Sequence, residues 1–223
     1  MSFARQAPVS QMMRLPLDVL ERELAQRTNV PGTSIYPAVF VDRDGTINVE
    51  KGYLDHPGNV ALLPTSGQAL RLLNRLSIPV VVITNQSALE RGLMKLDGFE
   101  SVNAAIWQAL QASDAYYDAL YYCPHTPDRT SPCACRKPQP GLLLQAAFDL
   151  DLDLRQCFLV GDKRSDIEAG RACGCQSILV RTGYGENAYL DIAAWEHQPD
   201  YMASTLLEAS QWIASRLQRV QPR

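Results

Sequence analysis

Two aspartates one residue apart, Asp42 and Asp44, are the residues of this sequence best placed to do chemistry. They follow the apolar run 38–41 and precede Gly45-Thr46. Neighbouring carboxylates repel each other unless a cation lies between them or one of them holds a proton. The pair is typical of a divalent metal site, or of a nucleophile beside a general acid–base group. A solvated turn at a strand end is the alternative, because Asp and Gly are ordinary turn residues.

Three further polar residues stand at similar places in the chain. Thr84 follows the apolar run 80–83, Asp162 closely follows the run 157–160, and Lys137 lies in a loop before a predicted helix. Because the carboxyl ends of parallel strands meet at one edge of a sheet, we expect these groups to converge on the two aspartates.

Together these residues suit phosphoryl transfer to a carboxylate. Asp42 would attack phosphorus, while a cation cancels the repulsion between the two anions. Thr84 and Lys137 would stabilise the equatorial oxygens. Asp162 would complete a shell of hard oxygen ligands, which suits Mg²⁺. Asp44 would protonate the leaving oxygen and then activate water, a task that favours a raised pKa.

Each residue also has a simpler interpretation. Thr84 could cap the next segment, Lys137 could be solvated, and Asp162 with Asp166 could be the N-cap and first-turn acid of a helix. The occurrence of all the core groups in this order favours catalysis over a catalytically silent binding module. Loss of either aspartate of the first pair would have been the signature of such a module.

A second cluster combines three cysteines with a histidine. Its members are Cys123, His125, Cys133 and Cys135. They make up a full tetrahedral set for a structural zinc and leave no open position for chemistry. The spacing is not that of a usual zinc finger, so reduced thiols beside a surface histidine are the alternative. The two cysteines around Gly174 are interpreted as small buried residues that flank a helix cap.

From residue 38 onward, apolar runs alternate with segments of helical spacing. Strands are predicted at residues 38–41, 80–83, 119–122, 157–160, 178–180 and 200–203. Helices are predicted at residues 65–76, 99–112, 140–150, 165–173 and 205–217. Thr65 or Ser66 is the predicted N-cap of the first helix, and Gly174 suits the C′ position of the fourth. Strands separated by helices indicate an α/β fold with a parallel sheet and right-handed crossovers.

The chain divides into an N-terminal extension, residues 1–36, and one domain, residues 37–223. The extension is interpreted as a tail or docking helix. Its residues 15–26 have an apolar face and are followed by a break at Pro31-Gly32. The segment 48–63 is predicted to be only a loop, too short for a mobile cap domain, so the site should be rather open.

Composition sets the broad class of the protein. A chain of 223 residues with a net charge of −3 and no dense basic tract is not expected to bind nucleic acid or a membrane surface. No apolar run approaches the ~20 residues that span a bilayer. Residues 1–10 lack the apolar core of a signal peptide, so a cytoplasmic location is the default. We expect a monomer that acts on a small molecule.

Four segments resemble, in order, the motifs of the haloacid dehalogenase-like (HAD-like) phosphatases. They are Val41-Asp42-Arg43-Asp44-Gly45-Thr46-Ile47-Asn48, Ile83-Thr84-Asn85-Gln86-Ser87, Cys135-Arg136-Lys137-Pro138 and Val160-Gly161-Asp162-Lys163. The resemblance extends over residues 37–185. It is closest to the D-glycero-D-manno-heptose 1,7-bisphosphate 7-phosphatases, whose relatives are the histidinol-phosphate phosphatases.

The resemblance implies a three-layer Rossmannoid HAD-like fold, capless, with a zinc-binding loop formed by the cysteine–histidine cluster. It implies a phospho-enzyme on Asp42, with Asp44 as the acid–base group. Mg²⁺ would bind the Asp42 side chain, the Asp44 backbone carbonyl and Asp162, while Thr84 and Lys137 hold the phosphoryl group. The residues implied in substrate binding are Glu50, Lys51, Gly52, Tyr53, Asn85, Gln86, Ser87, Arg136 and Lys163.

The implied activity is removal of the 7-phosphate of the heptose bisphosphate during the biosynthesis of nucleotide-activated heptose for lipopolysaccharide core, capsule or S-layer. The alternative is a histidinol-phosphate phosphatase, or a phosphatase of another small ester. Three cations, Lys51, Arg136 and Lys163, favour a substrate with a second anionic group. The sequence departs from the family at residues 87–92, where Ser-Ala-Leu-Glu-Arg-Gly replaces the common Ser-Gly-Ile-Ala-Arg-Gly. A glycine is lost and an acid gained near the expected substrate mouth.

Overall fold

The computed structural model describes residues 8–27, 36–131 and 133–220 of the chain. Within these ranges seven strands form one parallel sheet. They are β1 (Ser10–Gln11), β2 (Val39–Val41), β3 (Val80–Asn85), β4 (Ala119–Cys123), β5 (Phe158–Gly161), β6 (Gln176–Val180) and β7 (Tyr201–Ala203). Their order across the sheet is β1-β4-β3-β2-β5-β6-β7. The chain leaves β2 on one side towards β3 and β4, and returns to its other side at β5. Ligands bind at such a reversal, beyond the carboxyl ends of the strands.

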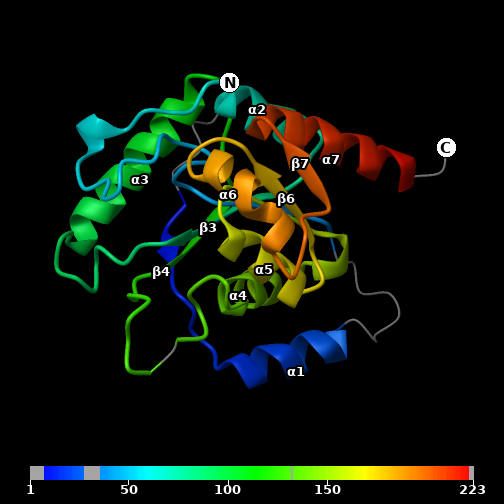
Figure 1. The fold of residues 1–223 in the computed structure, drawn as a ribbon, viewed down its shortest axis with the longest axis horizontal. Helices are drawn as coiled ribbons and strands as arrows, with labels where there is room; N and C mark the ends of the chain where they lie inside the picture. The colour runs from blue at the N-terminus through cyan, green and yellow to red at the C-terminus, as the bar shows by residue number, and fades with distance from the viewer. Residues whose placement is uncertain (1–7, 28–35, 132, 221–223) are drawn as a thin grey trace.

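Seven helices cover the two faces of this sheet in the described part of the chain (Figure 1). They are α1 (Leu17–Arg27), α2 (Ser66–Arg75), α3 (Leu96–Gln111), α4 (Gly141–Leu150), α5 (Arg164–Ala172), α6 (Gly185–Asp191) and α7 (Leu206–Val220). Three short 3-10 turns, Pro57–Asn59, Leu154–Gln156 and Ile192–Ala194, join some of them. The result is the predicted three-layer α/β architecture.

Alternation along the buried strands creates a separate core on each face. Val39 and Val41 of β2 pack with α2, α3 and α7, whereas Phe40 between them packs with α4 and α5. Successive side chains of a strand point to opposite faces, so an unbroken apolar run is what a sheet covered on both sides requires. Strand β2 is therefore packed against a core on each face, and this packing fixes the position of its carboxyl end.

Part of the N-terminal segment joins the sheet. Ser10 and Gln11 pair with Leu120 and Tyr121 of β4, and α1 packs along α4 at the bottom of Figure 1. Leu20 of α1 is fully buried. The division of the chain at residue 36 stays a prediction. The predicted break at Pro31-Gly32 lies outside the described residues.

The predicted strands and helices of residues 37–223 are confirmed, with ends that differ by a few residues. Strand β1 and helix α6 had no prediction, because two polar residues and a seven-residue segment carry too little periodic signal. Thr65 occupies the N-cap position of α2, but in the described structure its side chain makes no capping hydrogen bond. Its left-handed backbone (φ 70°) departs from the extended conformation of a capping residue. Gly174 has φ 78° just after α5, as its predicted place requires.

The segment between β2 and α2 is a loop, as predicted. In residues 42–65, all of which the structure describes, the one helical turn is Pro57–Asn59. In the described part of the chain we find no helix with the length and apolar character needed to cross a membrane.

Candidate active site

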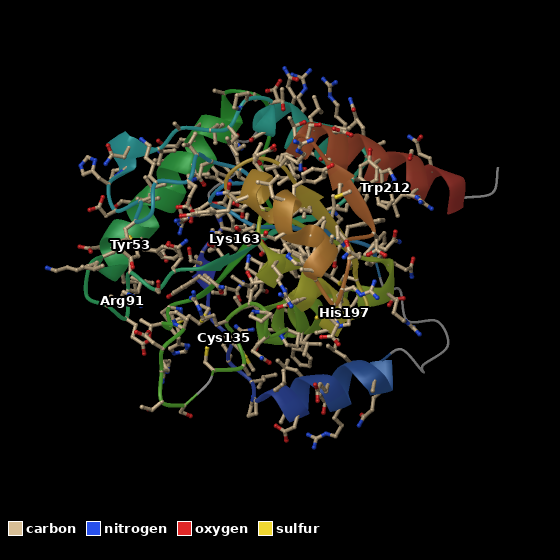
Figure 2. The ribbon with its side chains drawn as sticks, viewed as in Figure 1. Tyr53, Arg91, Cys135, Lys163, His197 and Trp212 are labelled. Carbon is tan, nitrogen blue, oxygen red and sulfur yellow. The ribbon has the colours of Figure 1, made fainter. Side chains whose placement is uncertain are left out.

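The carboxyl ends of β2, β3 and β5 open into a pocket of about 740 Å³. Asp42 directly follows β2, Thr84 lies near the end of β3, and Lys137 reaches the pocket from the loop before α4. Figure 2 shows Tyr53, Lys163 and Cys135 around this edge of the sheet, with Trp212 away from it on α7. The fold thus brings the four sequence segments to one place.

A buried lysine lies at the centre of the charged groups. Lys137 Nζ is 2.7 Å from Asp42 Oδ1, 2.6 Å from Asp166 Oδ1 and 2.7 Å from the carbonyl oxygen of Ile83. Burial alone would lower the pKa of Lys137, but the charges of Asp166 and Asp42 outweigh it and raise the pKa. The lysine is therefore held charged beside Asp42.

Asn85, a predicted substrate contact, is engaged with the backbone of this lysine. Its Nδ2 donates to the Lys137 carbonyl and its Oδ1 accepts from the Lys137 N–H, both at 3.1 Å. The amide also lines the pocket. Asn85 thus links the end of β3 to the loop that carries the lysine.

Asp166 is a site residue that sequence reasoning missed. It lies in the first turn of α5 and is fully buried, and its carboxylate bonds the backbone N–H of Lys163. The N-cap of α5 is Lys163 rather than Asp162, so the simpler interpretation of the two acids was half right. The available signal was an acid three residues after the N-cap, where a carboxylate can reach back to the backbone N–H of the N-cap residue.

The donor set of three buried carboxylates fits a hard cation. One oxygen each of Asp42, Asp162 and Asp166 lies within 4.8 Å of the others. Asp162 Oδ2 accepts from Tyr184 N–H at 2.8 Å, but its buried Oδ1 has no hydrogen-bond partner among the described residues. Burial, together with the charges of Asp42 and Asp166, raises the pKa of Asp162 to about 8. A divalent ion would satisfy the orphaned oxygen and relieve the repulsion.

Asp44 is held by several donors. Its Oδ2 accepts from Arg43 Nη2 at 2.8 Å, from Arg43 Nε at 3.1 Å and from Gln86 Nε2 at 2.8 Å. Its Oδ1 accepts from Asn48 Nδ2 at 2.8 Å. Burial opposes ionisation, but the Arg43 charge and these hydrogen bonds outweigh it and lower the pKa of Asp44. The raised pKa expected from the sequence is wrong for this arrangement, because the buried Arg43 was not anticipated.

Gln86 joins two of the predicted catalytic residues. Its Nε2 lies 2.8 Å from Thr84 Oγ1 as well as from Asp44 Oδ2. Ser87, the next residue, also lines the pocket. The second motif therefore supplies a hydroxyl, an amide bridge and a further hydroxyl from positions 84, 86 and 87.

Charged and aromatic groups surround the mouth. Lys163 Nζ is 3.1 Å from Glu50 Oε2 and 4.7 Å from the centre of the Tyr184 ring. Burial works against the charge of Lys163, but nearby carboxylates raise its pKa. Gly52 and Tyr53 line the pocket. Lys51 is exposed and is absent from the described residues that line it, so the structure does not bring this predicted contact to the site.

The cysteine–histidine cluster is compact. The three sulfur atoms of Cys123, Cys133 and Cys135 are 3.1 to 3.6 Å apart, and His125 Nδ1 is 3.2 Å from Cys135 Sγ. Tetrahedral zinc with bonds of about 2.3 Å separates its sulfur ligands by about 3.8 Å. The hydrogen bond with Cys123 lowers the pKa of Cys135 to about 6. Three thiols and an imidazole at nearly the right spacing fit a structural zinc.

The same loop reaches the pocket. Arg136 Nη1 donates to the His125 carbonyl at 2.9 Å and lines the pocket beside Lys137. At the outer end, Glu90 accepts from Arg129 Nη1 at 2.6 Å and from Thr126 N–H. Glu90 is the acid gained relative to the family pattern, and its place is a bridge to the cysteine–histidine loop.

Comparisons with known proteins agree with this geometry. The HAD-hydrolase-like family model matches residues 134–209. The D-glycero-D-manno-heptose-1,7-bisphosphate 7-phosphatase of Thermosynechococcus vestitus is 37% identical over 81% of this chain and 97% of its own length. The corresponding β-anomer enzyme of Escherichia coli K12 is 39% identical over 66% of this chain and 80% of its own.

Solved structures that are similar to this chain include heptose 1,7-bisphosphate phosphatases as well. The D,D-heptose 1,7-bisphosphate phosphatase of B. bronchiseptica, solved with magnesium and phosphate, superposes with a TM-score of 0.75 at 31% identity, over 81% of this chain and 99% of that one. The Burkholderia thailandensis enzyme of the same name gives a TM-score of 0.62 at 27% identity, over 80% and 99%. This chain therefore belongs to the D-glycero-D-manno-heptose-1,7-bisphosphate 7-phosphatase family of HAD-like hydrolases.

Proposed function

We propose that this chain is a Mg²⁺-dependent phosphatase that removes the 7-phosphate of D-glycero-D-manno-heptose 1,7-bisphosphate. The observation that carries the proposal is the buried charge cluster of Asp42, Lys137, Asp162 and Asp166, in a chain that shares 37% identity with a relative of that name. The cluster combines a nucleophile, a fixed cation and the ligands of a metal.

The proposed reaction has two steps. Asp42 attacks phosphorus, the bond from phosphorus to the sugar oxygen breaks, and Asp44 gives that oxygen its proton. Asp44 then takes a proton from water as the water oxygen bonds phosphorus and the Asp42–phosphate bond breaks. Lys137 and Thr84 stabilise charge on the phosphoryl oxygens. Lys137 also places its positive charge 2.7 Å from Asp42 Oδ1.

The Asp42 and Asp162 side chains and the Asp44 backbone carbonyl would hold Mg²⁺. The ion supplies positive charge that cancels repulsion between the nucleophile and the phosphate. Zinc in the Cys123, His125, Cys133 and Cys135 cluster would be structural. It would stiffen the loop that carries Arg136 and Lys137.

The far end of the substrate would meet the cations at the mouth. Lys163, Arg136 and Arg129 all line the pocket there, which favours a second phosphate over the amine and imidazole of histidinol phosphate. The product would serve the biosynthesis of nucleotide-activated heptose for lipopolysaccharide core, capsule or S-layer. A cytoplasmic monomer remains part of the proposal.

The test is phosphate release at equal enzyme with Mg²⁺ from three substrates: the α and β anomers of the heptose bisphosphate, and histidinol phosphate. A preference in kcat/KM of ~100-fold for one heptose anomer, about 2.7 kcal/mol of transition-state discrimination, supports the substrate and identifies the anomer. A preference for histidinol phosphate supports the alternative. Asp42→Asn should abolish turnover, and wild-type rates from that variant would exclude Asp42 as the nucleophile.

A further inference from the structure

Arg43, between the two motif aspartates, is an unusual residue for a protein core. It is the largest of the fully buried side chains described, at 1% exposure. Burial of a guanidinium is unfavourable unless its charge and its donors are matched. Residues that are unfavourable for stability in this way occur characteristically at functional positions.

The described hydrogen bonds of the guanidinium have two partners. One is Asp44, and the other is Asn103, which we call the brace because it supports the guanidinium from behind. Nε and Nη2 donate to Asp44 Oδ2 at 3.1 and 2.8 Å, and Nη1 donates to Asn103 Oδ1 at 2.9 Å. The ring of Phe99 lies 5.6 Å from the guanidinium carbon. Both Asn103 and Phe99 belong to α3, so this helix fixes the guanidinium.

Neither Arg43 nor Asn103 is among the described residues that line the pocket, whereas Asp44 is. The pair therefore reaches substrate only through Asp44. The brace continues away from the site, since Asn103 Nδ2 lies 3.4 Å from Ser10 Oγ of β1. This chain of contacts joins the N-terminal strand to the carboxylate.

The donors around Asp44 are divided unevenly between its two oxygens. Oδ2 accepts three hydrogen bonds, two from Arg43 and one from Gln86. Oδ1 accepts one, from Asn48. A carboxylate oxygen has two lone pairs, so Oδ2 is saturated and Oδ1 keeps a place for a proton.

We propose that Arg43, braced by Asn103, is a positioning residue that locks Oδ2 of Asp44 so that Oδ1 alone exchanges protons during the reaction. In the first step Oδ1–H gives its proton to the leaving oxygen as the phosphorus–oxygen bond breaks. In the second step Oδ1 takes a proton from the water that attacks the phospho-enzyme. The inference rests on the proposed function only in taking Asp44 as the acid–base group.

The experiment compares substrates that differ in their need for a proton. The 4-nitrophenolate ion leaves without one, whereas a sugar alkoxide or an unsubstituted phenolate is a poorer leaving group that benefits from acid catalysis. Because kcat/KM reports events up to phospho-enzyme formation, it isolates the step in which Asp44 acts as an acid. The variants are Arg43→Lys, which keeps the charge and loses the two-pronged contact, and Asn103→Leu, which removes the brace and keeps Arg43.

We expect both variants to lose about 10- to 100-fold in kcat/KM on the heptose bisphosphate and on phenyl phosphate. The value of kcat/KM for 4-nitrophenyl phosphate should stay within about threefold. Gln145→Leu is the matched control. Gln145 is likewise a buried amide that binds the N-terminal segment, through Arg14 N–H and Leu15 N–H, but it touches no site residue described here.

Equal losses on all three substrates, or the same selectivity in Gln145→Leu, would overturn the proposal and leave Arg43 a structural residue. If Arg43→Lys does not fold, Asn103→Leu decides alone. Failure of the proposed function is a separate outcome, because wild-type enzyme would then hydrolyse aryl phosphates and spare the heptose bisphosphate. The ratio between phenyl and 4-nitrophenyl phosphate would still test the role of Arg43.

Discussion

Each carboxylate of the site has its own electrostatic surroundings. Asp42 faces Lys137, Asp44 faces Arg43, and Asp162 faces other acids. For Asp44 and Asp162 burial favours the neutral acid, so the neighbouring charges decide the direction in which each pKa moves. The charge of Arg43 lowers the pKa of Asp44, whereas the charges of Asp42 and Asp166 add to the effect of burial at Asp162, which therefore needs a cation more than Asp44 does.

The raised pKa of Asp162 predicts how the stability of the metal-free protein depends on pH. The pKa of Asp162 is raised from 3.8 to about 8, so the folded state binds a proton that the unfolded state releases between those values. Stability should therefore fall as pH rises from about 4 to about 8. Asp162→Asn should flatten this fall and raise the melting temperature at pH 8. Thermal melts of both proteins in chelator would test it, and identical slopes would contradict it.

The same proton competes with magnesium. Below pH 8 the metal must displace it from Asp162, so the apparent affinity for Mg²⁺ should weaken by up to tenfold per pH unit. Calorimetric titration with Mg²⁺ between pH 6 and pH 9, in buffers of different ionisation enthalpy, would measure both the affinity and the released proton. Affinity that is independent of pH, without proton release, would show that Asp162 is already ionised before the metal binds.

At the scale of elements, the sequence was most informative where an apolar run ended in a polar group. The runs before Asp42, Thr84 and Asp162 predicted β2, β3 and β5 and placed their ends at one edge. Asp166 was missed because a first-turn acid is common in helices, and a pattern does not tell which acid turns inward. Arg43 was missed because residue type predicts an exposed guanidinium. Its burial depends on Asn103, which lies sixty residues away.

Strand β1 and helix α1 could not be placed by such patterns. Two polar residues become a strand only because β4 offers an open edge to them. Helix α1 has an apolar face, but periodicity does not say that this face packs on α4. Tertiary packing decides elements as short as these.

The packing of α1 makes a stability prediction. Leu20 is fully buried in the helix, so Leu20→Ala should lower the free energy of unfolding by about 2–5 kcal/mol. Val9→Ala, at a residue that is 80% exposed in the same segment, is the control and should change little. Urea denaturation would measure both. A wild-type midpoint for Leu20→Ala would mean that the segment is an appendage in solution, as the sequence alone suggested.

At the scale of the whole molecule, the catalytic groups divide into two classes according to whether the sheet or a loop carries them. Asp42, Thr84 and Asp162 stand on or just beyond strands that two cores hold in place. Arg136 and Lys137 stand on a loop that directly follows Cys135 of the cysteine–histidine cluster, and Arg136 bonds the His125 carbonyl. The proposed metal ligands therefore belong to the sheet, whereas these two cations come from the loop.

This division predicts what loss of zinc would do. Cys133→Ser removes one ligand from the cluster, so the loop should lose order and Arg136 should no longer lie over the pocket. We expect a lower melting temperature and a raised KM for the heptose bisphosphate, with Mg²⁺ affinity unchanged because the metal ligands belong to the sheet. Cys173→Ser is the matched control, since the Cys173 thiol donates to the Ala169 carbonyl outside the cluster and serine can replace it there. Zinc content by elemental analysis, measured together with KM and Mg²⁺ affinity, separates the two classes.

A Cys133→Ser protein without zinc that keeps its wild-type KM would show that the loop is ordered by its own packing and by the Glu90 bridge. A simultaneous loss of Mg²⁺ affinity would show that the loop and the sheet form a single unit.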